Sequence, residues 1–308
     1  MKHFLSIESL AGPEIGALVD EGLRLKARRG PDPGFCPLAA QIWAMLFTKS
    51  STRTRVSFEV GIRELGGQVM FLSGQDLQLD RGEPIRDTAR VLGRMLDGAI
   101  IRTFGQDEVE EFALHSGIPT INALTDEEHP CQILADLLTI RERLGGWEGR
   151  VLAFFGDGDC NMARSWMWAS ARLGFELRIA APKGFQPPRA FLERVGGNIA
   201  CTEEAMDAAA GADVLYTDVW VSMGKEEEGA DRIAAMEPFQ LNGELVERAA
   251  AGALVMHCLP AYRGKEISGE LLELHASTIF DQAENRLHAQ KAVLVSLAAG
   301  GPDGGRRT

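Results

Sequence analysis

The chain has 308 residues, of which 45% are hydrophobic and 25% are charged, and its formal net charge is -12. This length is enough to bury a sizeable core in two domains of ordinary size. The negative charge would repel a polyanion, so we expect no nucleic acid partner. No apolar run approaches the roughly 20 residues that cross a bilayer, and the N-terminal segment lacks the long apolar core of a secretory signal. We therefore expect a cytoplasmic protein with no membrane partner.

The five cysteines are scattered along the chain, and no two of them form a Cys-x-x-Cys pair. An odd number with irregular spacing argues against a disulfide framework and against a structural zinc site. We expect reduced thiols and no metal site.

The first half of the chain alternates apolar segments with amphipathic ones. Residues 15–25 have the spacing of a helix with one apolar face, and residues 42–47 form a continuous apolar run typical of a strand buried on both faces. A helix pattern follows and stops at Gly66 and Gly67. The later segments are predicted strands at 68–72, 98–102 and 118–124, a long loop at 73–86, and helices at 88–95 and 129–144.

The second half repeats this alternation after a glycine-rich linker at residues 145–149. Strands are predicted at 151–155, 175–180, 214–217 and 253–256, and helices at 162–173 and 284–299. The predicted fold class is α/β, with two doubly wound domains and mainly parallel sheets, in which ligands bind beyond the carboxyl ends of the strands. We place the first domain at residues 1–145 and the second at residues 150–280.

Residues 49–55 join the first strand to the next helix and concentrate polar groups suited to an anion. Within these seven residues lie four hydroxyl side chains and three cations. The first N–H groups of a helix lack an intrahelical acceptor and the helix dipole is positive there, so a phosphate group would bind well. The alternative is a capped helix whose arginines face solvent. Because one hydroxyl is enough for capping, the surplus of polar groups favours an anion site.

Polar side chains also follow other predicted strands, and each has a plain structural alternative. Arg102 ends one strand and is as easily a surface cation as a ligand. A lone histidine such as His129 is more often structural, and a cysteine such as Cys258 is usually a small buried residue. Asp218 begins a polar loop whose carboxylate and backbone N–H groups suit a zwitterion, although a solvated loop has the same composition.

The turn at residues 156–161 reads Gly-Asp-Gly-Asp-Cys-Asn and lies between a strand and a helix, as a dinucleotide-binding turn does. Two observations argue against that interpretation. Asn161 takes the place of the third glycine, and the next strand ends without the carboxylate that would hold a ribose hydroxyl. We expect no nicotinamide cofactor.

Six segments, taken in order, resemble motifs of the aspartate/ornithine carbamoyltransferase family. They are Ser-Thr-Arg-Thr-Arg at 51–55, His-Pro-Cys-Gln at 129–132, the turn at 156–161, Asp-Val-Trp-Val-Ser-Met-Gly at 218–224, His-Cys-Leu-Pro at 257–260, and residues 281–288. The resemblance covers residues 2–299, and the segments at 218–224 and 257–260 are similar to the ornithine branch. Cys160 departs from the family, which often has asparagine there, so local hydrogen bonding is expected to differ.

The resemblance implies transfer of the carbamoyl group from carbamoyl phosphate to the δ-amine of L-ornithine, giving L-citrulline and phosphate, in arginine metabolism. It also implies that no metal or organic cofactor is needed. The helix at 284–299 would pack back on a first domain that binds carbamoyl phosphate, while the second domain would bind ornithine. The implied assembly is a homotrimer, or a multiple of trimers, with sites between subunits.

The resemblance assigns residues to three roles. Catalytic roles fall to Arg102, His129, Asp218 and Cys258. Carbamoyl phosphate binding falls to Ser51, Thr52, Arg53, Thr54, Gln78, Arg102, His129, Gln132, Cys258, Leu259 and Arg286. Ornithine binding falls to Asn161, Asp218, Ser222 and Met223.

Two other functions stay open from the sequence. One is a sister carbamoyltransferase that uses another amine, such as an acylated ornithine or putrescine. An acylated ornithine would lack the free ammonium for which Asp218 is suited. The other is a catalytically silent relative that only binds anions or partners.

Overall fold

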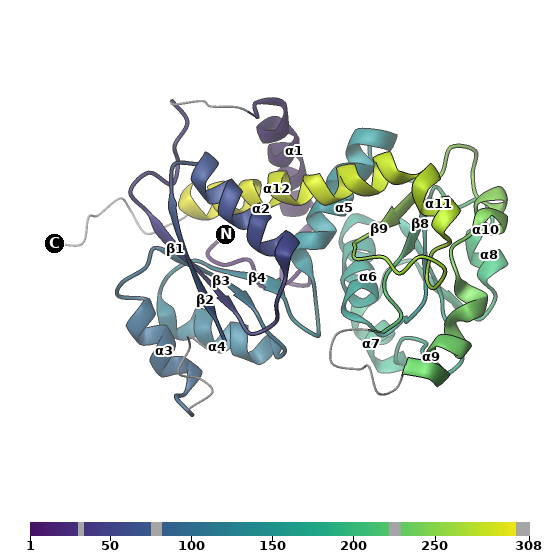
Figure 1. The fold of residues 1–308 in the computed structure, drawn as a ribbon, viewed down its shortest axis with the longest axis horizontal. Coiled ribbons are helices and arrows are strands. Elements are labelled where there is room, and N and C mark those ends of the chain that lie inside the picture. Colours follow the sequence, from purple (N-terminus) through teal and green to yellow (C-terminus); the bar gives the residue numbers. More distant parts are fainter. Residues whose placement is uncertain (30–33, 75–81, 222–228, 300–308) are drawn as a thin grey trace. The chain divides into compact units, whose positions relative to one another are not determined.

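The computed structural model describes residues 1–29, 34–74, 82–221 and 229–299 (Figure 1). The chain divides into two compact units. Unit 1 comprises Met1–Leu138 and Glu284–Thr308, and unit 2 comprises Thr139–Ala283. No helix within the described ranges is long and apolar enough to cross a membrane.

Unit 1 contains a parallel sheet of four strands in the order β2-β1-β3-β4. The strands are β1 (Ile42–Phe47), β2 (Gln68–Ser73), β3 (Gly98–Arg102) and β4 (Thr120–Leu124). Strand β1 lies in the interior of the sheet, and its side chains from Trp43 to Phe47 are buried, as its apolar run predicts. Phe47 pairs with Arg102, so the carboxyl ends of β1 and β3 lie side by side.

Helices cover both faces of this sheet (Figure 1). They are α1 (Gly12–Ala27), α2 (Thr52–Glu64), α3 (Ile85–Leu92), α4 (Gln106–Ser116), the first part of α5 (Pro130–Leu144) and the last part of α12 (Ala276–Ala299). Apolar side chains of α3 and α4 pack with those of β1 and β3 in one core cluster.

The last helix packs on unit 1, as predicted, although it begins at Ala276 and not at Glu284. Gly22 of α1 lies so close to Leu138 of α5 and to the backbone of Ala289 in α12 that an added Cβ would approach the Leu138 side chain to 2.6 Å. Lys26 of α1 also donates a hydrogen bond to Asn285 at 2.8 Å. The close approach of three helices therefore depends on a glycine at position 22.

Unit 2 contains a parallel sheet of five strands in the order β7-β6-β5-β8-β9. The strands are β5 (Val151–Phe155), β6 (Glu176–Ala180), β7 (Ile199–Thr202), β8 (Val214–Thr217) and β9 (Leu254–His257). The helices are α6 (Asn161–Leu173), α7 (Arg189–Val195), α8 (Ala205–Ala209), α9 (Gly229–Met236), α10 (Gly243–Arg248) and α11 (Gly269–Leu274), with a 3-10 helix η3 (Glu237–Phe239).

The two faces of this second sheet have different cores. Helices α8, α10 and α11 contribute to one cluster with Phe155, Leu215 and Val255 of the strands. The rings of Phe154 and Trp166 pack against the ring of Tyr216, with centroid distances to it of 5.8 and 5.4 Å. Such aromatic pairs add to the burial of apolar surface, so the central strands are fixed on both sides.

The predicted α/β class with two mainly parallel sheets is confirmed, but some boundaries were wrong. The helix predicted at 88–95 is α3, which begins at Ile85 directly after Pro84 and ends before Gly93. The strand predicted at 118–124 starts only at Thr120, because Pro119 has no N–H to donate to a ladder. The strand predicted at 253–256 is shifted by one residue, and His257 is the last residue of β9.

Candidate active site

The start of α2 is the first part of the candidate site, and Ser51 caps it. The Ser51 hydroxyl accepts a hydrogen bond from the Thr54 N–H at 3.3 Å and donates to the Thr54 hydroxyl at 2.9 Å. Thr52 begins the helix. One hydroxyl thus does the capping, and the backbone N–H groups of the first turn remain directed out of the helix end.

The three cations of the 49–55 segment have different surroundings. Lys49 pairs with Asp126 and lies 4.0 Å from the Phe104 ring centroid. Arg55 stacks on Phe71 at 3.9 Å from its centroid. Arg53 is half-buried, and its Nε has no hydrogen-bond partner among the described residues. Only Arg53 of the three is therefore left available for an anion.

Two further arginines complete what we call the arginine cluster, defined as Arg53, Arg102 and Arg286. Arg102 ends β3 and is 6% exposed, and Arg286 of α12 is 3% exposed. The Arg286 guanidinium donates to the Thr54 hydroxyl at 2.6 Å. Burial, followed by the charges of Arg286 and Arg53, lowers the pKa of Arg102 to about 10. The three like charges, two of them buried, repel one another, so a bound anion would stabilise the cluster.

His129 and Gln132 lie at the start of α5. Burial, followed by the charges of Arg286 and Arg102, lowers the pKa of His129 well below its ordinary value. The imidazole is therefore neutral at pH 7 and can donate one N–H without adding charge. Gln132 is buried, its amide nitrogen donates to Asp136 at 2.8 Å, and its amide oxygen has no partner among the described residues. The intervening Cys131 is also buried, and burial raises the pKa of its thiol to about 12.

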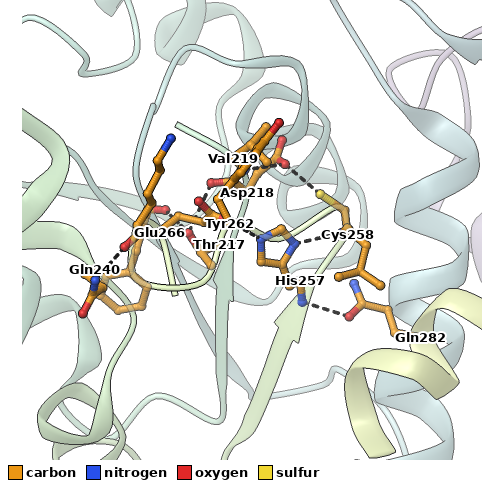
Figure 2. Close-up of polar contacts among 12 residues, drawn as sticks. Thr217, Asp218, Val219, Gln240, His257, Cys258, Tyr262, Glu266 and Gln282 are labelled. Carbon is orange, nitrogen blue, oxygen red and sulfur yellow. Dashed lines mark hydrogen bonds and ion pairs between the residues drawn. The ribbon is translucent and has the colours of Figure 1, made fainter. Parts of the chain in front are cut away.

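In unit 2, Asp218 and Cys258 form a thiol–carboxylate pair at the ends of the neighbouring strands β8 and β9 (Figure 2). The Cys258 thiol donates to Asp218 Oδ1 at 2.9 Å, and the Val219 N–H donates to the same oxygen at 2.7 Å. Burial raises the pKa of Asp218, although Cys258 and His257 oppose this shift. The pair therefore presents a partly buried carboxylate that a cationic amine would stabilise.

His257 holds the segment that carries Cys258 and Leu259. Its Nδ1 accepts from the Leu259 N–H at 2.8 Å, so Nε2 is the nitrogen that donates to Glu266 Oε1 at 3.0 Å. Glu266 Oε1 also accepts from the Tyr262 N–H at 2.6 Å, as Figure 2 shows. The sequence analysis missed Glu266, because a glutamate eight residues beyond Cys258 has nothing local that distinguishes it from a surface residue.

The turn at residues 156–161 places Asn161 at the first position of α6, where it is half-buried. Cys160 is the N-cap, and its sulfur accepts from the Ala163 N–H at 3.4 Å. Burial, and then the charges of Asp157 and Asp218, raise the pKa of the Cys160 thiol well above its ordinary value. The thiol thus remains protonated and takes over the capping role that an amide oxygen would have.

The described candidate residues fall into two groups. Unit 1 carries Ser51, Thr52, Arg53, Thr54, Arg102, His129, Gln132 and Arg286, and unit 2 carries Asn161, Asp218, Cys258 and Leu259. Gln78, Ser222 and Met223 lie outside the described residues. In the part of the chain that is described, no group of three or more His, Cys, Asp or Glu side chains could hold a metal ion.

Two models of one known family match most of the chain. The carbamoyl-P binding domain of the aspartate/ornithine carbamoyltransferases matches residues 2–142, and the Asp/Orn binding domain of the same family matches residues 148–297. The chain belongs to the aspartate/ornithine carbamoyltransferase family. The family resemblance inferred from the motifs is confirmed.

Several members of this carbamoyltransferase family are similar over nearly their whole length. The ornithine carbamoyltransferase of Akkermansia muciniphila is 60% identical over 301 residues, which cover 97% of this chain and 98% of the relative. The anabolic ornithine carbamoyltransferase of Pseudomonas aeruginosa is 48% identical, covering 96% of this chain and 97% of the relative. The crystal structure of the anabolic enzyme from Campylobacter jejuni aligns with a TM-score of 0.91 at 41% identity, covering 97% of this chain and 100% of that one.

Proposed function

We propose that the chain transfers the carbamoyl group of carbamoyl phosphate to the δ-amine of L-ornithine, giving L-citrulline and phosphate, in arginine biosynthesis. The observation that carries the proposal is the arginine cluster, because three guanidinium groups around the start of a helix, two of them buried, suit a phosphate dianion. The thiol–carboxylate pair supports an amine as the acceptor. Two of the similar proteins are named anabolic, which supports a biosynthetic role.

The residues of unit 1 act on the carbamoyl donor. The amine nitrogen forms a bond to the carbamoyl carbon, the bond from that carbon to the phosphate oxygen breaks, and phosphate leaves with the electron pair. Negative charge develops on the carbamoyl oxygen and on the leaving group. Neutral His129 and the guanidinium of Arg102 donate hydrogen bonds to the oxygen, while Ser51, Thr52, Thr54 and the remaining arginines bind the phosphate.

The amide of Gln132 serves the carbamoyl group in a different way. Its nitrogen is held by Asp136, so its buried oxygen is directed as an acceptor. The carbamoyl NH₂ group is a donor that satisfies such an oxygen. This assignment favours a carbamoyl group over an acetyl group of similar size, which has no N–H to donate.

The residues of unit 2 act on ornithine, whose δ-amine must lose a proton before it attacks. If the amine has a pKa like that of lysine, about 10.4, deprotonation at pH 7 costs about 4.6 kcal/mol. Asp218, Ser222 and Asn161 bind the α-ammonium and α-carboxylate groups, with the Met223 backbone N–H. Cys258 and Leu259 orient the δ-amine of ornithine and the carbamoyl group of carbamoyl phosphate. The desolvated surroundings lower the pKa of the amine. The proton lost before the attack goes to solvent, and the second proton, released from the nitrogen as the new bond forms, is taken up by the departing phosphate.

We further propose a cytoplasmic homotrimer, or a multiple of trimers, in which Gln78 reaches the carbamoyl phosphate of an adjacent subunit. The resemblance to the family supports this assembly. Exposed apolar side chains at Val56 on α2 and at Met70 on the edge strand β2 also suit a subunit interface. Light scattering of the purified protein should give three times the mass of one chain, or a multiple of that value.

The proposed reaction is tested by measuring carbamoylated product from carbamoyl phosphate with each of three amines: L-ornithine, N-acetyl-L-ornithine and putrescine. We expect kcat/KM for L-ornithine to exceed that for either other amine by at least about 100-fold, because an acylated or missing α-amino group leaves the charge of Asp218 unpaired. Preference for another amine would indicate a sister enzyme. Binding of phosphate without any carbamoylated product would indicate a silent relative.

A further inference from the structure

Arg232 lies in α9 and is almost fully buried, with 7% of its surface exposed. Its Nε donates to the backbone carbonyl of Trp220, and a terminal nitrogen donates to the carboxylate of Asp157. The guanidinium also lies 4.8 Å from the ring centroid of Phe185. None of these contacts is local, because the three partners come from three other segments of unit 2.

Each of the three segments follows a different strand of the same sheet. Asp157 follows β5, Phe185 lies in the loop after β6, and Trp220 follows β8. Strand β5 pairs with both β6 and β8. A single side chain therefore ties together three loops at the carboxyl edge of the sheet, where ligands of parallel α/β folds bind.

Asp157 connects Arg232 to the turn that carries Asn161. One oxygen of its carboxylate accepts from Arg232, and the other accepts from the Asp159 N–H at 3.0 Å. The Cys160 N–H bonds to the Asp157 carbonyl at 3.3 Å. The turn has little freedom elsewhere, since a Cβ at Gly158 would lie 2.8 Å from the Pro187 side chain. The orientation of Asn161 is thus linked to the position of the Asp157 carboxylate.

Trp220 connects Arg232 to the segment that carries Asp218, which lies two residues earlier in the chain. The indole of Trp220 is 2% exposed, and a Cβ at Gly156 would approach it to 3.5 Å. Arg232 binds the backbone carbonyl of this buried residue, so it restrains the path of the chain directly after Asp218. Asn161 and Asp218 are the two described residues proposed above to bind the amino-acid end of ornithine.

We propose that Arg232 is a positioning residue for ornithine: by bridging Asp157 and Trp220 it holds Asn161 and Asp218 at the separation that the α-ammonium and α-carboxylate groups require. The inference rests on the proposed function. An arginine suits this task because its planar fork reaches a carboxylate and a carbonyl at once while its face packs on an aromatic ring, which the point charge of lysine does not do. Arg232 touches no substrate and acts through the two residues it positions.

The test compares steady-state kinetics of Arg232→Gln, Arg232→Lys and Asp157→Asn with the unsubstituted protein. We expect the KM for L-ornithine to rise at least tenfold in Arg232→Gln and less in Arg232→Lys, while the KM for carbamoyl phosphate stays within twofold. Asp157→Asn keeps the shape of the side chain but weakens the ion pair, so it should shift the same parameter. Combining Asp157→Asn with Arg232→Gln should add little, because both remove one bridge.

Arg178 offers a matched control within the same unit. Its guanidinium binds the carboxylate of Glu176 and the backbone carbonyls of Ala208 and Ala210, yet it lies within β6 rather than at the carboxyl edge. Arg178→Lys should lower thermal stability without changing the KM for ornithine. A general structural role for Arg232 would likewise lower the melting temperature and the active fraction, which reduces kcat and leaves KM unchanged.

The outcomes separate this inference from the function on which it rests. An unsubstituted protein that makes no citrulline overturns the proposed function and this inference with it. An active protein whose folded Arg232 and Asp157 variants keep an unchanged KM for ornithine overturns the positioning role alone. If Arg232→Gln does not fold, the kinetics of Asp157→Asn, which preserves the shape of the side chain, provide the test. A rise in KM for ornithine alone would then support the positioning role of Arg232.

Discussion

The candidate residues of the two units share a topology and differ in electrostatics. Both lie at the carboxyl ends of parallel strands. Unit 1 gathers positive charge, and burial with neighbouring guanidinium groups lowers the pKa of Arg102 to about 10. Unit 2 gathers a carboxylate and thiols, and burial raises the pKa values of Asp218 and Cys160. A bound anion would stabilise the first group of residues, and a bound cation would stabilise the second.

The difference shows how one kind of sheet supports the two sides of a transfer reaction. In unit 1, a helix start and arginines follow the strands, which suits a group that leaves as an anion. In unit 2, an aspartate and a cysteine follow adjacent strands, which suits an amine that arrives as a cation. The chain has a formal charge of -12, so the binding of an anion depends on local groups rather than on the overall field.

The largest expected loss of activity follows from removing an arginine that we assign to anion binding alone. Arg53→Ala should lower kcat/KM for carbamoyl phosphate by about 10²–10³-fold, the usual effect of losing one preorganised donor to a developing anion. Because Arg53 Nε has no protein partner among the described residues, the melting temperature should change little. Steady-state kinetics at saturating ornithine measures the effect.

The same segment provides the control for that variant. Arg55 is two residues away but stacks on Phe71 and lies 3.8 Å from Glu59. Arg55→Ala should therefore reduce kcat/KM less than tenfold. Equal losses for the two arginines would contradict the assignment of Arg53, rather than Arg55, to the arginine cluster.

On the acidic side, Asp218→Asn should lower kcat/KM for ornithine by about 100-fold, the lower range for groups that assist proton transfer or pair with a charged substrate. The effect should be confined to ornithine, since Asp218 is assigned to ornithine and not to carbamoyl phosphate. Titration of the variant with carbamoyl phosphate by calorimetry provides the check. A parallel loss of carbamoyl phosphate affinity would show that the two halves are not chemically separate.

The pH dependence of the rate should reflect the amine rather than His129. Below the pKa of the bound amine, each pH unit should raise kcat about tenfold, because only the neutral amine attacks. The pKa of His129 lies well below its ordinary value, so the imidazole is already neutral and adds no second rise above pH 6. A flat profile from pH 6 to 9 would contradict this account.

How far the sequence predicts the site depends on whether a role is local. Ser51, Thr52 and Thr54 act through a helix start, so residue type and spacing were enough to propose an anion site. The segment holds three cations, but Lys49 and Arg55 have partners from distant parts of the chain, and spacing does not show them. Identifying Arg102 and Arg286 as parts of one cluster required the family resemblance.

Residues that hold others in place were the hardest to predict. Glu266 and Arg232 resemble surface charges in the sequence, and only the fold reveals that both are buried. Their partners are backbone groups as well as side chains, and backbone groups leave no sequence signal. Two other boundaries were wrong because proline or glycine at an element end outweighed the apolar pattern, as Pro119 does before β4 and Gly93 does after α3.

A moderate effect on stability should follow from Glu266→Gln. Glu266 is fully buried, one of its oxygens accepts from two donors, and the other has no partner among the described residues. An amide there either weakens the bonds to His257 and Tyr262 or leaves its NH₂ group unsatisfied. We expect the free energy of unfolding to fall by about 1–3 kcal/mol, measured by urea titration. An unchanged unfolding midpoint would show that this network does not hold the Cys258 segment.

The smallest expected effect concerns Cys160. Cys160→Ser replaces a weak sulfur acceptor by an oxygen at the N-cap of α6, so the free energy of unfolding should rise by about 0.5–1 kcal/mol. The rate of citrulline formation should stay within twofold. A large loss of activity would instead show that the sulfur itself contributes to ornithine binding.

The claim that residues of unit 1 bind the phosphate group, and that Asp218 of unit 2 does not, is tested most directly by calorimetric titration of the purified protein with inorganic phosphate. The account predicts one phosphate bound per chain, affinity weakened at least tenfold by Arg53→Ala, and affinity unchanged by Asp218→Asn. A folded protein that does not bind phosphate, or phosphate binding that depends equally on Asp218, would contradict it.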